Sequence, residues 1–265
     1  MRLSVAIAGE HALPSAFVVW RGFEDSFRKA GEYGFDGVEL SLHRADDIIP
    51  GKLDTLLSKN GLVVSAVSTS QIFADGGMCL THEDASIRAK TMDILMELVQ
   101  VCGEFGKTMS LGRVRGSIFS NLSEGYFTEN ITRLCEEAEK HEVTIILEPL
   151  NRYESNLINN LDEAAELINT ASLKNLRILA DLFHMNIEDD NISASLKRNS
   201  EFVHYVHLAD SNRLAPGWGH LDFCEVFRTL DEIGFRGWTA LEVLPKPTPD
   251  KAAKQAVTHL QNKII

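Results

Sequence analysis

Four polar residues in the second half of the chain each come directly after a strand-like run of apolar residues. They are Glu148, Asp181, His207 and Glu242. The run 143–147, Val-Thr-Ile-Ile-Leu, is rich in β-branched residues and predicts a buried strand. Pro149 cannot extend a central strand, so this strand ends on the carboxylate of Glu148. An ionised carboxylate is costly to bury unless a positive charge lies close to it.

A divalent metal ion would explain why three carboxylates and one imidazole follow four successive predicted strands. If the strand ends meet, the carboxylates repel one another strongly unless a cation lies between them. Carboxylate oxygens with one imidazole nitrogen suit Mn²⁺, Mg²⁺ or Co²⁺ better than they suit a thiolate-type zinc site. The alternative is four unrelated polar residues at strand ends, which is the better explanation for any one of them alone. Their occurrence on four strands in succession favours a metal site.

Three of these positions have a further polar residue in the loop that follows. The pairs are Glu148 with Glu154, Asp181 with His184, and His207 with Arg213. Such loops would lie above a metal ion, where a substrate would bind. Each downstream residue also has a structural explanation, as a helix-capping acid, a packed core histidine and a surface cation respectively.

Strand-like and helix-like segments alternate along the whole chain. The predicted strands are 3–8, 38–42, 62–67, 108–111, 143–147, 176–180, 202–206 and 238–241. The predicted helices are 22–33, 52–59, 83–105, 128–141, 162–170, 192–198, 222–233 and 250–262. Eight βα units of about 33 residues each predict an α/β protein with the (β/α)8 TIM barrel fold, as a single domain over residues 1–265. Residues 72–80 and 113–126 are predicted loops, and Thr81 is the expected cap of the third helix.

In such a barrel the carboxyl ends of all strands meet at one end, where the βα loops carry the chemistry. Side chains alternate along a strand, so Ile146 shares a face with Glu148, and Ala240 shares a face with Glu242. If these faces point into the barrel, the four candidate ligands converge. The alternative fold is an open doubly wound sheet. That fold would need a glycine-rich turn after the first strand, but residues 8–11 are Ala-Gly-Glu-His, without a GxGxxG pattern.

Composition and charge limit the partners and the compartment. The 265 residues are 44% hydrophobic, and the formal net charge of −12 argues against nucleic acid and anionic membranes as partners. No segment approaches the roughly 20 apolar residues of a membrane span, and the N-terminal residues suit a first strand better than a secretory signal. The cysteines are scattered without a CxxC pair, which predicts free thiols and a cytoplasmic location. They are Cys79, Cys102, Cys135 and Cys224.

Four segments together resemble the motifs of a known family. They are EPLNRYE (148–154), DLFHM (181–185), HLADSNR (207–213) and LEV (241–243). These motifs resemble those of the xylose isomerase-like TIM barrels of the sugar isomerase and epimerase group. The closest resemblance is to the ketose 3-epimerases of the D-tagatose and D-psicose 3-epimerase type, and it covers essentially the whole chain.

The resemblance implies a role for seven residues. One divalent metal ion, with Mn²⁺ expected first and Co²⁺ or Mg²⁺ as alternatives, would be held by Glu148, Asp181, His207 and Glu242. The catalytic pair that transfers protons would be Glu148 and Glu242. The hydroxyls and carbonyl at one end of a sugar would be contacted by Glu154, His184 and Arg213. The resemblance also implies a homo-oligomer, either a dimer or a tetramer.

The predicted reaction is therefore the metal-dependent epimerisation of a small sugar or sugar derivative. One glutamate would remove the proton next to the ketose carbonyl, which leaves an enediolate stabilised by the metal. The other glutamate would return a proton to the opposite face of the same carbon. Glu148 on the fifth strand and Glu242 on the eighth would lie on opposite barrel walls, which suits a ketose 3-epimerase.

Alternative functions remain open for the same fold. An aldose–ketose or hydroxypyruvate-type isomerase would return the proton to the adjacent carbon, and an inosose-type dehydratase would expel water. An abasic-site endonuclease would need a multi-metal site richer in histidine and a basic DNA-binding face, against which the net charge of −12 argues. A barrel that only binds a ligand would have no need of all seven polar residues.

Some residues depart from the family pattern or have two interpretations. Phe183 precedes the histidine of the DxxH motif, where relatives often carry a small residue or cysteine. Trp218 and His220, in the loop after Arg213, could line the pocket or pack the loop. Arg113 and Arg115 could neutralise a phosphate or carboxylate of the substrate, or they could pair with the protein's own acids. Phosphorylated and acidic sugars therefore remain candidate substrates.

Overall fold

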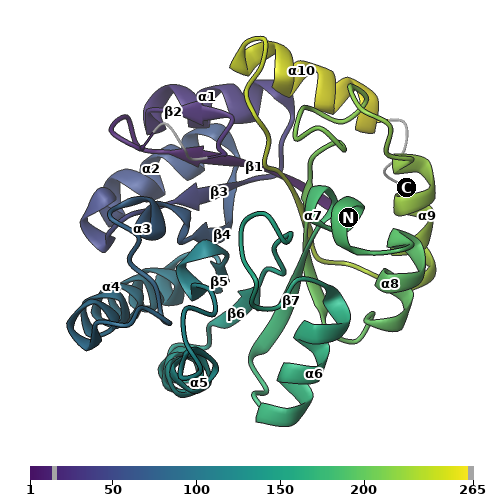
Figure 1. The fold of residues 1–265 in the computed structure, drawn as a ribbon. Helices are drawn as coiled ribbons and strands as arrows, with labels where there is room; N and C mark the ends of the chain where they lie inside the picture. The colour runs from purple at the N-terminus through teal and green to yellow at the C-terminus, as the bar shows by residue number, and fades with distance from the viewer. Residues whose placement is uncertain (14–16, 262–265) are drawn as a thin grey trace.

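Eight parallel strands close into a barrel with helices around it (Figure 1). The computed structural model describes residues 1–13 and 17–261. The barrel strands are β1 (Arg2–Ala8), β3 (Gly37–Ser41), β4 (Val63–Ser68), β5 (Thr108–Leu111), β6 (Thr144–Leu147), β7 (Leu176–Asp181), β8 (Val203–Leu208) and β9 (Trp238–Leu241). They pair in this order, and β9 pairs with β1 to close the sheet. The predicted (β/α)8 barrel is confirmed.

A two-residue strand, β2 (Trp20–Arg21), was not predicted. It pairs with Ile7 and Ala8 at the carboxyl end of β1, whereas β9 pairs with residues 2–5 of β1. Two residues are too few to show the alternation of apolar and polar side chains from which strands are predicted.

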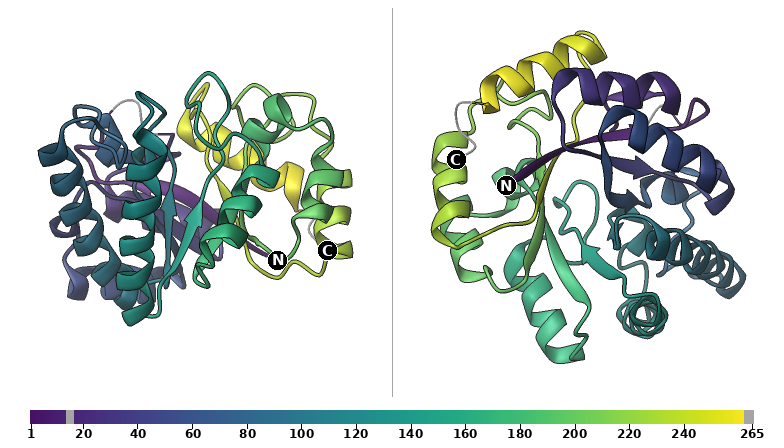
Figure 2. Two further views of the ribbon diagram at one scale, coloured as in Figure 1. Left: turned by 60° about the horizontal axis from the view of Figure 1, so that its bottom comes forward. Right: turned by 180° about the vertical axis from the view of Figure 1, so that it is seen from behind.

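The helices lie outside the barrel or in the loops at its carboxyl end (Figure 2). They are α1 (Phe23–Tyr33), α2 (Pro50–Asn60), α3 (Ser70–Ala74), α4 (Ala85–Glu104), α5 (Ser123–Lys140), α6 (Leu161–Ala171), α7 (Leu182–Glu188), α8 (Ile192–Arg198), α9 (Phe223–Glu232) and α10 (Pro249–Leu260). Two 3-10 turns, η1 (Ala45–Asp47) and η2 (Arg113–Arg115), complete the elements. Within residues 1–13 and 17–261, no helix has the length and apolarity needed to cross a membrane.

The core has two parts. A large cluster fills the layer between strands and helices. A smaller one consists of Ala66, Ile146, Leu179, Tyr205, Trp238 and Ala240, which come from five different barrel strands and therefore lie inside the barrel. Because Ile146 and Ala240 are in this cluster, the faces that carry Glu148 and Glu242 point inward, as predicted.

Several predicted boundaries were wrong. The predicted loop 72–80 begins inside α3, and the predicted loop 113–126 contains η2 and the start of α5, which begins at Ser123 and not at 128. Thr81 does not cap the third long helix. The N-cap is Asp84, which accepts a hydrogen bond from the Ser86 backbone N–H at 2.8 Å, whereas Thr81 Oγ1 accepts one from the Ser117 N–H. The last helix begins at Pro249, and residue 262 at its predicted end lies outside the described residues.

Helix α7 was also absent from the prediction, although it directly follows β7. Its N-cap is Asp181, whose Oδ1 accepts hydrogen bonds from the backbone N–H groups of Phe183 and His184 at 2.8 and 3.3 Å. All four cysteines are free thiols, as predicted, and Cys224 alone among them is exposed.

Candidate metal centre and active site

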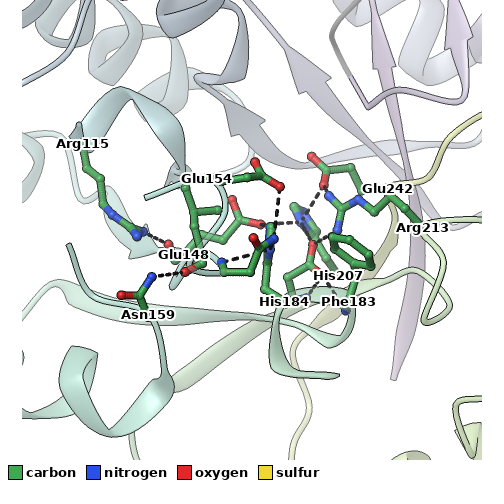
Figure 3. Close-up of polar contacts among 12 residues, drawn as sticks. Arg115, Glu148, Glu154, Asn159, Phe183, His184, His207, Arg213 and Glu242 are labelled. Carbon is green, nitrogen blue, oxygen red and sulfur yellow. Dashed lines mark hydrogen bonds and ion pairs between the residues drawn. The ribbon is translucent and has the colours of Figure 1, made fainter. Parts of the chain in front are cut away.

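The four predicted ligands come together at the carboxyl end of the barrel (Figure 3). One ligand atom of each lies within 4.8 Å of the others, and all four residues are buried; the residues are Glu148, Asp181, His207 and Glu242. His207 Nδ1 is the centre of the group, at 3.4 Å from one oxygen of each carboxylate. Four neighbouring strands thus supply one compact set of three carboxylates and an imidazole.

This donor set fits a divalent metal ion. Within the described part of the chain, Glu148 Oε1 and His207 Nδ1 are buried without a hydrogen-bond partner. Donor atoms about 2.1 Å from a small divalent ion would lie roughly 3.0–3.4 Å from one another, which matches the separations around Nδ1. Buried unpaired polar atoms are costly, and a cation between these four residues would satisfy both of them.

Room for the Glu148 carboxylate depends on a glycine at the end of β5. Gly112 lies beside the carboxylate, and a Cβ atom there would be only 2.6 Å from Glu148 Oε2. Any larger residue would displace the carboxylate. The glycine after this strand therefore belongs to the site.

Arg213 carries positive charge into the cluster. Its guanidinium donates to Asp181 Oδ2 at 2.5 Å and to Glu242 Oε2, and its side chain is 5% exposed. The ring centroids of Phe17 and Phe183 lie 4.9 and 5.1 Å from its Cζ. Phe183, the departure from the family pattern, thus packs on the arginine, as cation–π contacts favour. The structural interpretation of Arg213 as a surface cation is wrong.

The three carboxylates differ in how readily they take a proton. Burial raises the pKa of Asp181, but Arg213 and the nearby histidines outweigh this and hold it well below its usual range. Burial also raises the pKa of Glu242, and His207 with Arg213 lowers it overall. Burial and the charges of Glu242 and Asp181 raise the pKa of Glu148 to about 7, despite its contact with His207. Without a bound cation, Glu148 is therefore the carboxylate that is protonated most readily.

Asn151 connects two of the predicted substrate-binding residues, His184 and Glu154. His184 Nδ1 faces the Asn151 side-chain amide at 2.7 Å and its backbone N–H at 3.3 Å. Two donors to Nδ1 place the ring proton on Nε2, which lies 3.8 Å from Glu148 Oε1. The same amide nitrogen donates to Glu154 Oε1 at 3.2 Å. Sequence reasoning missed Asn151, although it lies within the EPLNRYE motif.

Arg115 has neither of the two roles considered for it. It is fully buried, and its guanidinium donates to three backbone carbonyls. These belong to Glu148, Leu157 and Ile158, with the bonds to Leu157 and Ile158 at 2.6 and 2.7 Å. Arg115 therefore fastens the loop after β6 to the loop after β5. Arg113, in the same turn, is exposed and lies over the ring of Phe73 at 4.5 Å.

The loop that contains Trp218 and His220 folds around a carboxylate. Asp210 accepts hydrogen bonds from the N–H groups of Ser211, Gly217 and Leu221. His220 is exposed and its Nδ1 lies 2.9 Å from Ser211 Oγ, whereas Trp218 packs against the main core. In this arrangement both side chains contribute to the packing of the loop.

A cavity of about 980 Å³ opens at the ends of β1 and β3, against α1 and α2. Its lining includes His11, His43, Gln71 and Asp75 but none of the seven predicted site residues. Since chemistry needs the convergent carboxylates, the reacting atoms of a substrate are expected at the metal cluster and not in this cavity.

Comparisons with known proteins agree with the fold. A family model for the xylose isomerase-like TIM barrel matches residues 27–263. A D-psicose 3-epimerase from Enterocloster bolteae is 28% identical, in a match that covers 81% of this chain and 74% of that protein. A 3-dehydro-D-guloside 4-epimerase from Escherichia coli is 39% identical over 111 residues, which are 42% of each chain. The crystal structure of the apo 3-keto-D-glucoside 4-epimerase from E. coli has the same fold, with a TM-score of 0.80, 23% identity and 99% of both chains covered.

The contrast between Arg115 and Arg113 gives a test of the loop structure. Arg115→Met keeps most of the volume but removes a donor from three carbonyls. The carbonyls of Leu157 and Ile158 keep longer bonds, at 3.4 Å, from Ser155 Oγ and the Leu150 N–H, whereas Arg115 is the one donor to the Glu148 carbonyl among the described residues. The unsatisfied carbonyl of Glu148 costs about 1–3 kcal/mol and each lost bond to the other two about 1 kcal/mol, partly offset because a buried charge is also removed, so we expect a loss of roughly 2 kcal/mol in the free energy of unfolding. The exposed control Arg113→Met should change it by less than about 0.5 kcal/mol. Urea unfolding measures both, and equal small changes would contradict the role given to Arg115.

Proposed function

The chain belongs to the xylose isomerase-like TIM barrel family, and on that premise we propose that it is a metal-dependent sugar epimerase. The observation that carries the proposal is the buried group of three carboxylates and one imidazole with two atoms left unpaired. The relatives named in the sequence comparison are sugar epimerases, which are enzymes of the isomerase class. A family fold alone would not support an activity, because one fold serves many functions.

The ligands of the proposed ion are Glu148, Asp181, His207 and Glu242. A divalent ion held by these residues would supply the positive charge that polarises a substrate carbonyl and stabilises negative charge on the enediolate. Mn²⁺ is proposed first, with Co²⁺ and Mg²⁺ as alternatives, because the set is rich in oxygen and has one nitrogen.

Glu148 and Glu242 are proposed to move the proton. They follow β6 and β9, which are separated in the sheet by β7 and β8, and they lie on either side of His207 (Figure 3). One carboxylate removes the proton from the carbon next to the carbonyl, and the other returns a proton to the opposite face. The stereocentre is thereby inverted, and the same pair serves the reverse reaction with exchanged roles.

The remaining three predicted residues are proposed to hold the sugar. His184 presents its Nε2 proton near Glu148, which suits a hydrogen bond to a substrate oxygen. Glu154 is partly exposed and its carboxylate is steadied by Asn151, so it can accept a bond from a sugar hydroxyl. Arg213 supports Asp181 and Glu242 in addition to any contact with the substrate.

Two substrate classes fit this chemistry. The match to a D-psicose 3-epimerase over 81% of the chain favours a free ketose, which is inverted at C3 beside its C2 carbonyl. The shorter but closer match to a 3-dehydro-D-guloside 4-epimerase favours a 3-keto glycoside inverted at C4. Both reactions invert a carbon that bears a hydroxyl next to a carbonyl, so the same two glutamates would serve either one. We propose the ketose 3-epimerase first because its match covers more of the chain.

Removal of the metal is the first test. The protein treated with EDTA should be inactive and should recover with Mn²⁺ or Co²⁺. Because binding favours the folded state, Mn²⁺ at 100 times its dissociation constant should stabilise the fold by about 2.7 kcal/mol, or roughly 5 °C or more in melting temperature. An Asp181→Asn variant, which loses one ligand, should show a much smaller shift. Full activity in the metal-free protein would contradict the proposal.

Substitution of the two glutamates is the second test. Glu148→Gln and Glu242→Gln keep the shape but remove the base, and each should lower kcat at least 100-fold at saturating Mn²⁺, the low end of general-base contributions. Glu154→Gln is the matched control, for which we expect a higher KM and a smaller change in kcat. Arg213→Ala should weaken Mn²⁺ binding as well as raise KM, because Arg213 contacts Asp181 and Glu242. A Glu242→Gln enzyme with near wild-type kcat would exclude the proton-transfer pair.

The site of deuterium incorporation is the third test and identifies the reaction. Free ketoses, ketose phosphates, keto-acid sugars and 3-keto glycosides are incubated with the Mn²⁺ enzyme in D₂O and followed by NMR. Deuterium at C3 of a ketose, together with the C3 epimer, is the expected result, because the carboxylates can reach both faces of one carbon. Deuterium at C4 of a 3-keto glycoside would assign the second substrate class.

Other outcomes of the same experiment would replace the proposal. Deuterium at C1 with an aldose product would identify an aldose–ketose isomerase, and a product that has lost water would identify a dehydratase. If no sugar exchanges deuterium, the epimerase proposal is contradicted although the fold and the metal site still stand. Cleavage of abasic DNA would then be assayed.

A further inference from the structure

A carboxylate outside the predicted site contacts the histidine ligand. Glu39 lies on β3, is fully buried, and its Oε2 is 3.0 Å from His207 Nε2. Its other oxygen, Oε1, has no hydrogen-bond partner among residues 1–13 and 17–261. His207 lies on β8, so the contact crosses the interior of the barrel between strands that are not neighbours. An acid in this position calls for an explanation, because burial of an ionised carboxylate is costly.

The contact decides which nitrogen of His207 carries the proton. An ionised carboxylate can only accept a hydrogen bond, so the partner nitrogen, Nε2, carries the proton. In a neutral imidazole this leaves the lone pair on Nδ1, the atom that lies 3.4 Å from Glu148, Asp181 and Glu242. Glu39 therefore selects the form of His207 that can donate electrons to a cation between the three carboxylates.

Polar residues below His207 line the barrel next to Glu39. The Tyr205 ring lies edge-on to the His207 ring at 5.7 Å, and its hydroxyl is 2.8 Å from Ser65 Oγ. Ser65 Oγ in turn lies 2.6 Å from Ser4 Oγ. Burial and the nearby charge of Glu39 raise the pKa of Tyr205 well above its usual value, so its hydroxyl stays neutral. Glu39 and His207 thus lie among buried side chains in the barrel interior.

We propose that Glu39 is a positioning residue for the metal site, which orients His207 and increases its strength as a ligand. This inference rests on the proposed function, since it needs a metal at the four ligands. A carboxylate that accepts from the second nitrogen of a metal-bound histidine makes the imidazole more basic, and loss of such a partner weakens metal binding 10–100-fold. A purely structural role in the barrel interior would instead change stability and leave metal affinity unaltered.

Metal affinity of the full chain separates these two roles. Isothermal titration with Mn²⁺ is carried out on the wild-type protein, on Glu39→Gln and on Ser65→Ala. Ser65→Ala is the matched control, because it removes a buried polar group from the same interior without touching His207. We expect the Kd for Mn²⁺ to rise at least 10-fold in Glu39→Gln and to stay within about 2-fold of wild type in Ser65→Ala, with the melting temperatures of the metal-free proteins as a check on folding.

A measurement on the wild-type chain does not depend on the stability of any variant. In the Mg²⁺-bound, ¹⁵N-histidine-labelled protein, the His207 ring should carry its proton on Nε2, and that proton should be in a hydrogen bond. An Nε2 proton without a hydrogen bond would overturn the inference, whereas a proton on Nδ1 would overturn the metal site itself.

The outcomes also separate this inference from the proposed function. If the wild-type protein binds neither Mn²⁺ nor Co²⁺, the metal site itself fails and the role of Glu39 fails with it. If the wild-type protein binds Mn²⁺ and Glu39→Gln binds it equally well, only the role of Glu39 is overturned.

Discussion

The carboxyl end of this barrel is built around the repulsion between three carboxylates that surround one imidazole. Their ligand atoms lie within 4.8 Å of one another and are buried. At an effective dielectric constant of about 20, each pair of like charges at such a distance costs roughly 3 kcal/mol. That energy has to be offset by positive charge held in the same place. Arg213 supplies part of it, and the unpaired atoms of Glu148 and His207 indicate where a cation would supply the rest. A buried arginine and two unpaired ligand atoms, each costly alone, are therefore consequences of a single constraint.

Residues of the carboxylate cluster also form hydrogen bonds that hold the backbone of the surrounding loops. Asp181 Oδ2 faces the cluster, and Asp181 Oδ1 caps α7. The helix that carries His184 therefore begins directly after a candidate metal ligand. The carbonyl of Glu148 accepts from Arg115, which ties the loops after β5 and β6 together. Arg213 has a positive φ of 62°, and its carbonyl accepts from Leu244 N–H just past β9. The loops after β5 to β9 therefore depend in part on residues of the cluster for their own structure.

The sequence predicted the barrel and the four residues that converge at its carboxyl end because both leave a local pattern, namely apolar runs of strand length that end on a polar residue. Features that depend on distant partners left no such pattern. Helix α7 was missed because its cap, Asp181, was already accounted for as a strand end, and the helix begins at the very next residue without an intervening loop. The partners of Arg115 are carbonyls 33–43 positions away, and no side-chain pattern marks a carbonyl as an acceptor. Glu39 is one acid in the strand Gly-Val-Glu-Leu-Ser, and its partner is 168 positions further on. Only the closed barrel brings these two residues face to face.

The division of the barrel into two halves bears on how a substrate would be chosen. All four candidate ligands follow or lie on β6–β9, and the residues proposed to hold the reacting end of a sugar come from the loops of the same half. From the first half, Glu39 reaches the cluster through the interior and Gly112 makes room for a carboxylate, but neither presents a group to solvent. The chemistry requires only a hydroxyl-bearing carbon beside a carbonyl, which a free ketose and a 3-keto glycoside both offer. A free ketose and a 3-keto glycoside differ in the part of the substrate that is remote from that carbon. The loops after β1, β3 and β4 supply none of the four candidate ligands, so they can differ without disturbing the cluster, and we expect selection between the two substrate classes there.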